Sequence, residues 1–142
     1  MNEEDKHRYI NILTTNRNAV IVIDSDRKRT NGRLNDTKVR IRDEFIKNKM
    51  PCWITKGKEI ENYLSVDAIS KAFGKVRKKQ CGQFEAFSDY IKSSSSLYNS
   101  SKVGFANKMI EHMEADNVEV LDIKEQILKL AKYIEKWNEG II

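Results

Sequence analysis

The pattern of apolar positions predicts a short α/β segment at the start of the chain. Residues 5–15 carry an apolar stripe at helical spacing, and residues 19–23 form an unbroken apolar run rich in valine and isoleucine. A run without alternation is typical of a strand covered on both faces, as in a parallel sheet between helices. A helix is predicted over 36–49, before Pro51, and a second short strand over 52–55. This order predicts a βαβ unit.

The remainder of the chain is predicted to be mostly helical. Ser65 is placed to cap a helix that ends at Gly74, and apolar spacings mark further helices around Phe87 and Ala106. The serine-rich stretch 93–101 predicts an exposed, mobile loop between them.

The last helix is predicted from Asp122, which forms a capping-box pattern with Glu125. Its apolar residues recur at alternating spacings of four and three, at Ile123, Ile127, Leu130, Ile134 and Trp137. A stripe of about two heptads favours a face that packs on the core, because a coiled coil needs about three or four.

These elements predict an α/β fold with a short parallel sheet of two or three strands flanked by helices. The length of 142 residues fits a single domain, with the α/β part over 1–65 and a helical part over 66–142. No apolar run approaches the roughly 18 residues of a membrane span, and the polar, acidic N-terminus is unlike a secretory signal. The isolated Cys52 and Cys81 therefore predict a cytoplasmic chain with free thiols.

Basic residues are concentrated directly after the first predicted strand. Between Arg27 and Lys49 there are nine basic residues and three acidic ones, within a chain of net charge +5. Such a region predicts contacts to a polyanion, with an ordinary solvated helix face as the alternative. The candidate nucleic-acid-binding residues are Arg27, Lys28, Arg29, Arg40 and Arg42.

Two aspartates follow the first predicted strand, where α/β folds place their ligands. Asp24 and Asp26 are separated by one residue, and in a turn their carboxylates can converge on one cation. Mg²⁺ prefers such oxygen ligands, and the two cysteines and two histidines of the chain stand apart, without the close spacing of a zinc site. The alternative is that Asp24 ends the strand as a turn or cap residue and that Asp26 is merely exposed.

A second acidic pair follows the second predicted strand. Glu59 and Glu61 flank Ile60, and an extended Glu-Ile-Glu would point both carboxylates one way and Ile60 into the core. Because parallel strands end at the same edge of a sheet, both acidic pairs are expected there. One glutamate would then complete a first metal site or start a second. The alternative is a solvated loop with one helix-capping glutamate.

The strand with Asp24-Ser25-Asp26-Arg27, followed by Lys58-Glu59-Ile60-Glu61-Asn62-Tyr63-Leu64, resembles the Toprim domain of OLD-family (overcoming lysogenisation defect) ATP-dependent endonucleases. The resemblance covers roughly residues 5–138. It implies that Asp24 and Asp26 bind Mg²⁺ or Mn²⁺ and that Glu61 serves a second metal. It also implies that Lys102 stabilises charge at the scissile phosphate, with a plain surface lysine as the alternative. Such domains follow ABC-type ATPases in phage-defence systems and cut DNA.

The resemblance is incomplete at the start of the domain. A Toprim domain begins with a strand that ends in a glutamate, and nothing before Asp24 fits that strand. The sequence therefore predicts part of a nuclease centre, completed by an ATPase domain or subunit that supplies the missing glutamate; homo-oligomers are left open. The main alternative is a non-catalytic Toprim-like module that binds nucleic acid or a partner protein.

Two other families share a strand followed by Asp-x-Asp. Haloacid-dehalogenase phosphatases usually have threonine or valine where this chain has Arg27, and their later Gly-Asp motif is missing. Response-regulator receiver domains need an acidic pair well before the phosphorylated aspartate, which the chain also lacks. Both families are therefore disfavoured.

Overall fold

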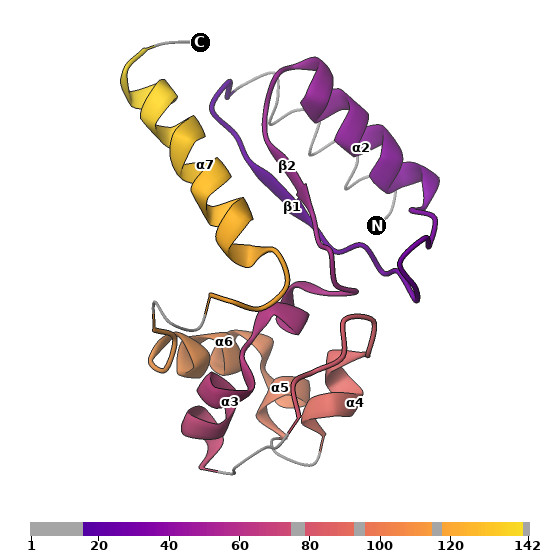
Figure 1. Ribbon diagram of the computed structural model, residues 1–142, viewed down its shortest axis with the longest axis vertical. Helices are drawn as coiled ribbons and strands as arrows, with labels where there is room; N and C mark the ends of the chain where they lie inside the picture. The colour runs from indigo at the N-terminus through magenta and orange to yellow at the C-terminus, as the bar shows by residue number, and fades with distance from the viewer. Residues whose placement is uncertain (1–15, 75–78, 93–95, 115–117, 141–142) are drawn as a thin grey trace.

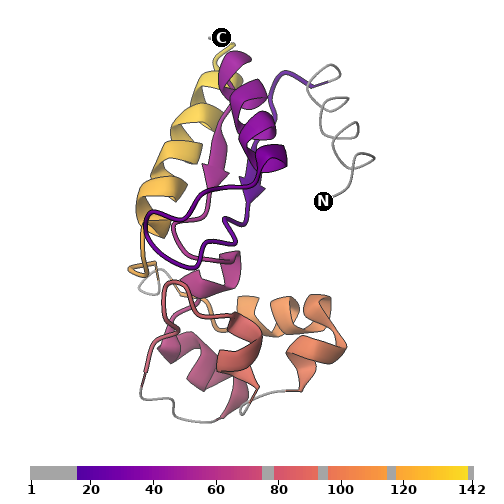
Figure 2. The ribbon, with the colours of Figure 1, turned by 90° about the vertical axis from the view of Figure 1, so that its right-hand side faces the viewer.

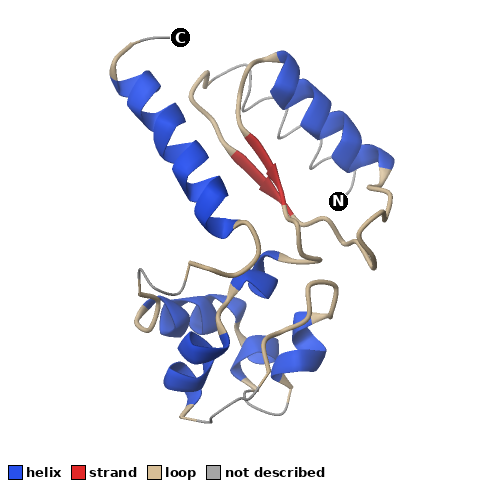
Figure 3. Cartoon of the chain, in the orientation of Figure 1, coloured by secondary structure: helices blue, strands red, loops and turns tan. Residues whose placement is uncertain are grey.

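A short parallel sheet lies at the centre of the α/β part of the chain. The structure is a computed structural model that describes residues 16–74, 79–92, 96–114 and 118–140. Strand β1 (Ile21–Ile23) pairs in parallel with β2 (Cys52–Ile54), in a register that places Val22 opposite Trp53. The predicted α/β fold with a short parallel sheet is confirmed (Figure 3). The helix predicted over 5–15 lies outside the described residues.

Helix α2 (Asp36–Lys47) connects the two strands and covers one face of the sheet. Asn35 caps it, since its side chain accepts a hydrogen bond from the Lys38 amide, as expected of an asparagine at this position. Ile41 and Phe45 of α2 pack with Ile21 and Ile23 of β1, while Val22 between them points to the opposite face. Helix α7 (Ile123–Asn138) lies along that opposite face (Figures 1 and 2).

The helices that follow β2 form a second hydrophobic cluster below the sheet (Figure 1). The contributing helices are α3 (Val66–Phe73), α4 (Phe87–Ile91), α5 (Leu97–Ser100) and α6 (Lys102–Ile110), and the short helix η1 (Ile60–Tyr63) precedes them. Ser65 caps α3 and Gly74 ends it in the left-handed region, as predicted. Phe87 lies at the centre, 0% exposed, with the Tyr98 and Phe105 rings edge-on to it at centroid distances of 5.1 and 5.7 Å.

The serine-rich stretch 93–101 is not a loop throughout, as the sequence predicted. Residues 97–100 form α5, and the Tyr98 side chain is buried beneath α6. The composition was misleading because one aromatic ring among many serines is enough to anchor a helical turn to an apolar cluster. Residues 93–95 lie outside the described part of the chain.

The predictions for α7 require two corrections. Asp122 makes no capping hydrogen bond, because its carboxylate instead accepts from the Tyr63 hydroxyl at 2.6 Å. The apolar stripe is not a core face, since no residue of α7 is buried and Ile127 and Ile134 are 44% and 50% exposed. A helix of 16 residues is about 24 Å long, whereas a strand of three residues spans only about 10 Å. Two such strands cannot cover the helix.

Candidate metal centre

The loop that carries Asp24 and Asp26 is tied to the loop after β2 by three hydrogen bonds. The Ser25 amide donates to Thr55 Oγ1 at 2.8 Å, and the Ser25 hydroxyl donates to the Gly57 carbonyl at 2.6 Å. The Asp26 amide donates to the Lys58 carbonyl at 2.9 Å. Ser25 and Thr55 are buried, so the two bonds that Ser25 makes are shielded from water. The structure therefore holds both acidic segments at the same edge of the sheet, as the parallel arrangement predicted.

Asn62 of the Glu-Asn-Tyr motif has a structural role. Its side chain is 1% exposed; Oδ1 accepts from the Glu59 amide at 2.8 Å, and Nδ2 donates to the carbonyls of Gly82 and Glu85 at 2.9 and 3.0 Å. Gly57 makes room for this side chain, because a Cβ on residue 57 would lie 2.9 Å from Asn62 Cβ. Asn62 thus links the turn that carries Glu59 to the distant segment before α4.

Tyr63 fixes the other end of the same turn. Its hydroxyl accepts from the Lys56 amide at 2.7 Å and donates to Asp122 at 2.6 Å, while its ring stands edge-on to Trp53 at 5.4 Å. Burial, followed by the hydrogen bond to Asp122, raises the pKa of Tyr63 to about 12. The hydroxyl therefore stays protonated. Together, Asn62 and Tyr63 anchor the turn that carries Glu61.

Asp24 is half-buried and lies within electrostatic reach of the second acidic segment. Its Oδ1 accepts from the Ile60 amide at 2.7 Å, which joins the end of β1 directly to η1. Burial raises the pKa of Asp24, and the charges of Glu61 and Asp26 raise it further, against the Ile60 amide and Lys38, which lower it. Burial is thus the main reason why ionisation of Asp24 is disfavoured, and the nearby acids add to it.

Glu61 lies beside Lys102, another residue that the sequence placed in the site. Its Oε1 accepts from the Tyr98 hydroxyl at 3.0 Å and lies 3.8 Å from Lys102 Nζ. The Glu61 side chain is 18% exposed, whereas that of Lys102 is 72% exposed and lies over the Tyr98 ring. Glu59 is also shielded, and burial followed by repulsion from Glu61 raises its pKa. The chain thus brings predicted residues from η1 and α6 together.

The extended Glu-Ile-Glu arrangement predicted for residues 59–61 is wrong. Residues from Ile60 onward form the 3₁₀ helix η1, and Ile60 is 38% exposed rather than in the core. The alternation of a strand does not apply in a helix, where successive side chains turn around an axis. The predicted alternation of Glu59, Ile60 and Glu61 is therefore absent.

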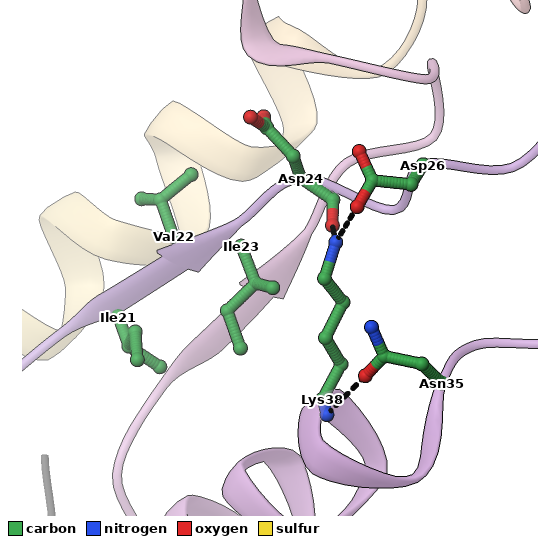
Figure 4. A pocket seen from close by; sticks show the side chains of 7 residues that line it. All are labelled: Ile21, Val22, Ile23, Asp24, Asp26, Asn35 and Lys38. Carbon is green, nitrogen blue, oxygen red and sulfur yellow. Dashed lines mark hydrogen bonds and ion pairs between the residues drawn. The ribbon is translucent and has the colours of Figure 1, made fainter. Parts of the chain in front are cut away.

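Lys38 occupies the space beside Asp26. Its ammonium donates to the Asp24 carbonyl at 2.6 Å and forms an ion pair with the Asp26 carboxylate (Figure 4). The Lys38 side chain is only 8% exposed. The sequence counted Lys38 only among the basic residues after the first strand. The sequence does contain a sign that Lys38 faces the core, because Lys38 lies on the same helix face as the buried Ile41 and Phe45.

The predicted convergence of Asp24 and Asp26 on one cation does not occur in this arrangement. The Asp26 carboxylate faces Lys38, whereas that of Asp24 points away from both (Figure 4). They border a pocket of about 280 Å³ that also includes Asn35. Within the described residues, no group of three or more Asp, Glu, His or Cys side chains is arranged to hold a metal ion. The donor set in place is therefore partial, and it does not by itself fit a complete Mg²⁺ or Mn²⁺ site.

The predicted nucleic-acid-binding residues differ in their environments. Lys28 and Arg29 are exposed in the loop after β1, and Arg40 is exposed on α2. Arg42 is partly covered and pairs with Asp43 at 2.7 Å. Arg27 Nε is buried without a hydrogen-bond partner among the described residues. The charges available to a polyanion therefore lie mainly on Lys28, Arg29 and Arg40.

Comparisons with known proteins do not assign this site. No protein-family model, no curated protein and no solved structure matches the chain. The chemistry of the site is that of a shielded acidic edge with Lys38 on one side and Lys102 on the other.

Asparagine in place of Asp24 is expected to stabilise the fold at neutral pH. The pKa of Asp24 is raised on folding, so the ionised carboxylate opposes the folded state at pH values above the raised pKa. The penalty disappears as pH falls below the unfolded value near 3.8. Asparagine keeps the acceptor for the Ile60 amide. We expect a gain of less than about 1 kcal/mol, because a half-buried charge is screened by solvent. Urea unfolding at pH 7 and pH 3.5 should show the gain only at pH 7; a loss at pH 7 would contradict it.

Proposed function

We propose that this chain contributes the acidic edge of a Toprim-type nuclease centre that uses Mg²⁺ or Mn²⁺ and cleaves phosphodiester bonds of DNA. The observation that supports this most is the hydrogen bond from the Ile60 amide to Asp24, at 2.7 Å. It brings the carboxyl end of β1 against the turn that carries Glu61, and Glu61 is in turn 3.8 Å from Lys102. Acids and a cation from distant segments thus meet where parallel sheets bind ligands.

The residues of the centre have different roles in this proposal. Asp24 and Glu61 are the acids left for a metal ion, with Glu59 nearby. Lys102 provides an accessible positive charge for a phosphate, because most of its side chain is exposed. Bound Mg²⁺ or Mn²⁺ would supply an activated water molecule and charge neutralisation. Further ligands, above all the missing Toprim glutamate, are proposed to come from a partner such as an ATPase domain or subunit.

Substrate binding is proposed to use the exposed basic residues beside this edge. Lys28 and Arg29 lie in the loop that follows Asp26, and Arg40 lies on α2. Contacts of this kind neutralise phosphates and make binding strongly dependent on salt. They carry no base specificity, so the proposal predicts little sequence preference from this surface.

Metal binding and plasmid nicking test the proposal. We expect the chain to bind Mn²⁺ in calorimetry, and Asp24→Asn to weaken that binding at least about tenfold because a carboxylate ligand is lost. Nicking of supercoiled plasmid, by the chain alone or with its partner, should depend on Mn²⁺ or Mg²⁺ and fall at least about a hundredfold in the same variant. Asp89→Asn, an exposed aspartate on α4, is the matched control and should behave like the unaltered chain.

Two outcomes would contradict the nuclease assignment. One is the absence of any Mn²⁺ binding by the unaltered chain, both alone and together with its partner. The other is nicking that survives Asp24→Asn, because the activity would then come from elsewhere or from a contaminant. Asparagine keeps the hydrogen bond to the Ile60 amide, so a loss of activity in this variant does not reflect a lost contact in the fold.

A non-catalytic module is the second candidate. It is favoured by the ion pair between Lys38 and Asp26, which satisfies that carboxylate without a metal. Such a module would bind nucleic acid or a partner protein through its basic surface. Salt-dependent DNA binding without nicking, lost when Arg40 and Arg42 are changed to glutamine, would support this candidate.

A cytoplasmic location is part of the proposal. Cys52 and Cys81 are not joined in a disulfide, which suits a reducing compartment. Among the described helices, none has the length and apolar composition that crossing a bilayer requires. A nuclease acting on DNA in the cell would work in the same compartment.

A further inference from the structure

An apolar pocket opens next to the acidic edge, between η1 and α6. Its volume is about 300 Å³. Its walls are formed mainly by Leu64, Phe105, Met109 and Met113. The side chains of Phe105 and Met109 are buried in the helical cluster, so the floor of the pocket belongs to the rigid core. Nothing in the sequence pattern indicated this pocket.

One end of the pocket is polar, and it is shared with the proposed centre. Glu61, Tyr98 and Lys102 all line it. The Tyr98 hydroxyl donates to Glu61 at 3.0 Å, and Lys102 Nζ lies 4.9 Å from the centroid of the Tyr98 ring. The pocket thus offers an apolar slot with a carboxylate acceptor and an exposed cation at its mouth. A ligand that fills it must combine a flat or compact apolar body with hydrogen-bond donors and an anion.

We propose that this pocket binds one unstacked nucleobase of a single-stranded nucleic acid, with the adjoining phosphate against Lys102. The inference rests on the proposed function for its choice of substrate. Bases bind single-strand-specific proteins by inserting their faces among aromatic and apolar side chains, which every base can do. The edge of the base would donate N–H groups to Glu61. A base held here places the neighbouring phosphodiester at the acidic edge, because Glu61 belongs to both.

Size and charge favour a base over the other occupants. The pocket is at the lower end of the roughly 300–1,000 Å³ typical of small-molecule sites, so it has room for a single ring system and not for a helix. An apolar side chain of a partner protein would fill the slot, but it would bring nothing to pair with Glu61 and Lys102. A nucleotide complements both charges and the apolar walls.

Filling the pocket tests the inference without any metal. Ala106 lines the pocket and is exposed on α6, so Ala106→Phe should occupy the slot without disturbing the core. Binding of a labelled oligothymidylate would be measured by fluorescence anisotropy in EDTA, with a duplex of the same length as comparison. We expect single-strand binding to weaken at least about tenfold, as for the loss of one stacked base, and duplex binding to change less than about twofold. Ala131→Phe, on the exposed side of α7, is the matched control.

A second variant tests the site independently, in case Ala106→Phe alters the local structure. Lys102→Gln should weaken single-strand binding and reduce the slope of affinity against salt by about one phosphate contact. An unchanged single-strand affinity in Ala106→Phe, or an equal loss of duplex binding, would overturn the pocket assignment. A salt slope unchanged in Lys102→Gln would overturn the phosphate contact. The two proposals can also be told apart. If Ala106→Phe weakens single-strand binding as expected but Mn²⁺ does not bind, the base-binding pocket is supported and the nuclease proposal is contradicted.

Discussion

Replacing Asn62 by alanine is expected to lower the free energy of unfolding by about 3 kcal/mol. The change leaves the carbonyls of Gly82 and Glu85 and the amide of Glu59 without their buried partner. Each unsatisfied buried group costs about 1–3 kcal/mol, and part of this is recovered if water enters the space. Urea unfolding followed by circular dichroism measures the effect.

Asn107→Ala is the matched control for this variant, because Asn107 is exposed on α6. We expect its free energy of unfolding to stay within about 1 kcal/mol of the unaltered chain, as for most surface changes. A similar small change in Asn62→Ala would contradict the structural role given to Asn62. The same variant should also weaken nicking, since the turn that presents Glu61 loses its anchor to the segment before α4.

Replacing Asp26 by asparagine is expected to lower the free energy of unfolding by about 2 kcal/mol. Lys38 would keep its charge in a side chain that is 8% exposed, with the Asp24 carbonyl as its remaining partner. Breaking a fully buried pair costs about 3–5 kcal/mol, and the value here is smaller because the Asp26 side chain is 61% exposed. Asparagine is chosen because residue 26 has a φ of +52°, which asparagine tolerates better than alanine does.

A second substitution, at the ion-pair partner Lys38, identifies the cause of this loss of stability. Removing the charge as well, in Asp26→Asn with Lys38→Met, should restore at least about 1 kcal/mol, because no unpaired ammonium then remains. Urea unfolding of both single variants and the double variant gives the coupling energy directly. Purely additive effects would show that the ion pair does not stabilise the loop. A double variant that is stable yet inactive would separate the role of Asp26 in chemistry from its role in the fold.

Carboxylate substitutions in this chain therefore need a stability measurement beside every activity measurement. Asp24→Asn is expected to stabilise the fold, whereas Asp26→Asn is expected to destabilise it, although the two residues are separated only by Ser25. The difference arises because Asp24 lies among other acids and Asp26 lies against a lysine. Loss of activity in Asp26 variants alone would not identify a metal ligand.

Much of the local structure could be predicted from the chain. The valine- and isoleucine-rich run before Asp24 predicted a strand in a parallel sheet, and Ser65 and Gly74 predicted the limits of α3. These predictions succeeded because strand formation and helix caps depend on residues close in sequence. The meeting of the Asp24 and Glu61 segments was also predictable, since parallel strands end at one edge.

The sequence by itself determined the parallel sheet, the limits of α3 and the presence of acids at one edge, because these follow from residues close in sequence and from strand direction. Only the tertiary structure decided which of these acids are paired with a lysine and which are left for a metal ion. Lys38 lies 14 residues from Asp24 and reaches it because α2 packs back on β1. The packing of Tyr98 under α6 likewise placed Lys102 beside Glu61 and formed the apolar pocket. Such contacts depend on how whole elements dock, which no local pattern of residues encodes.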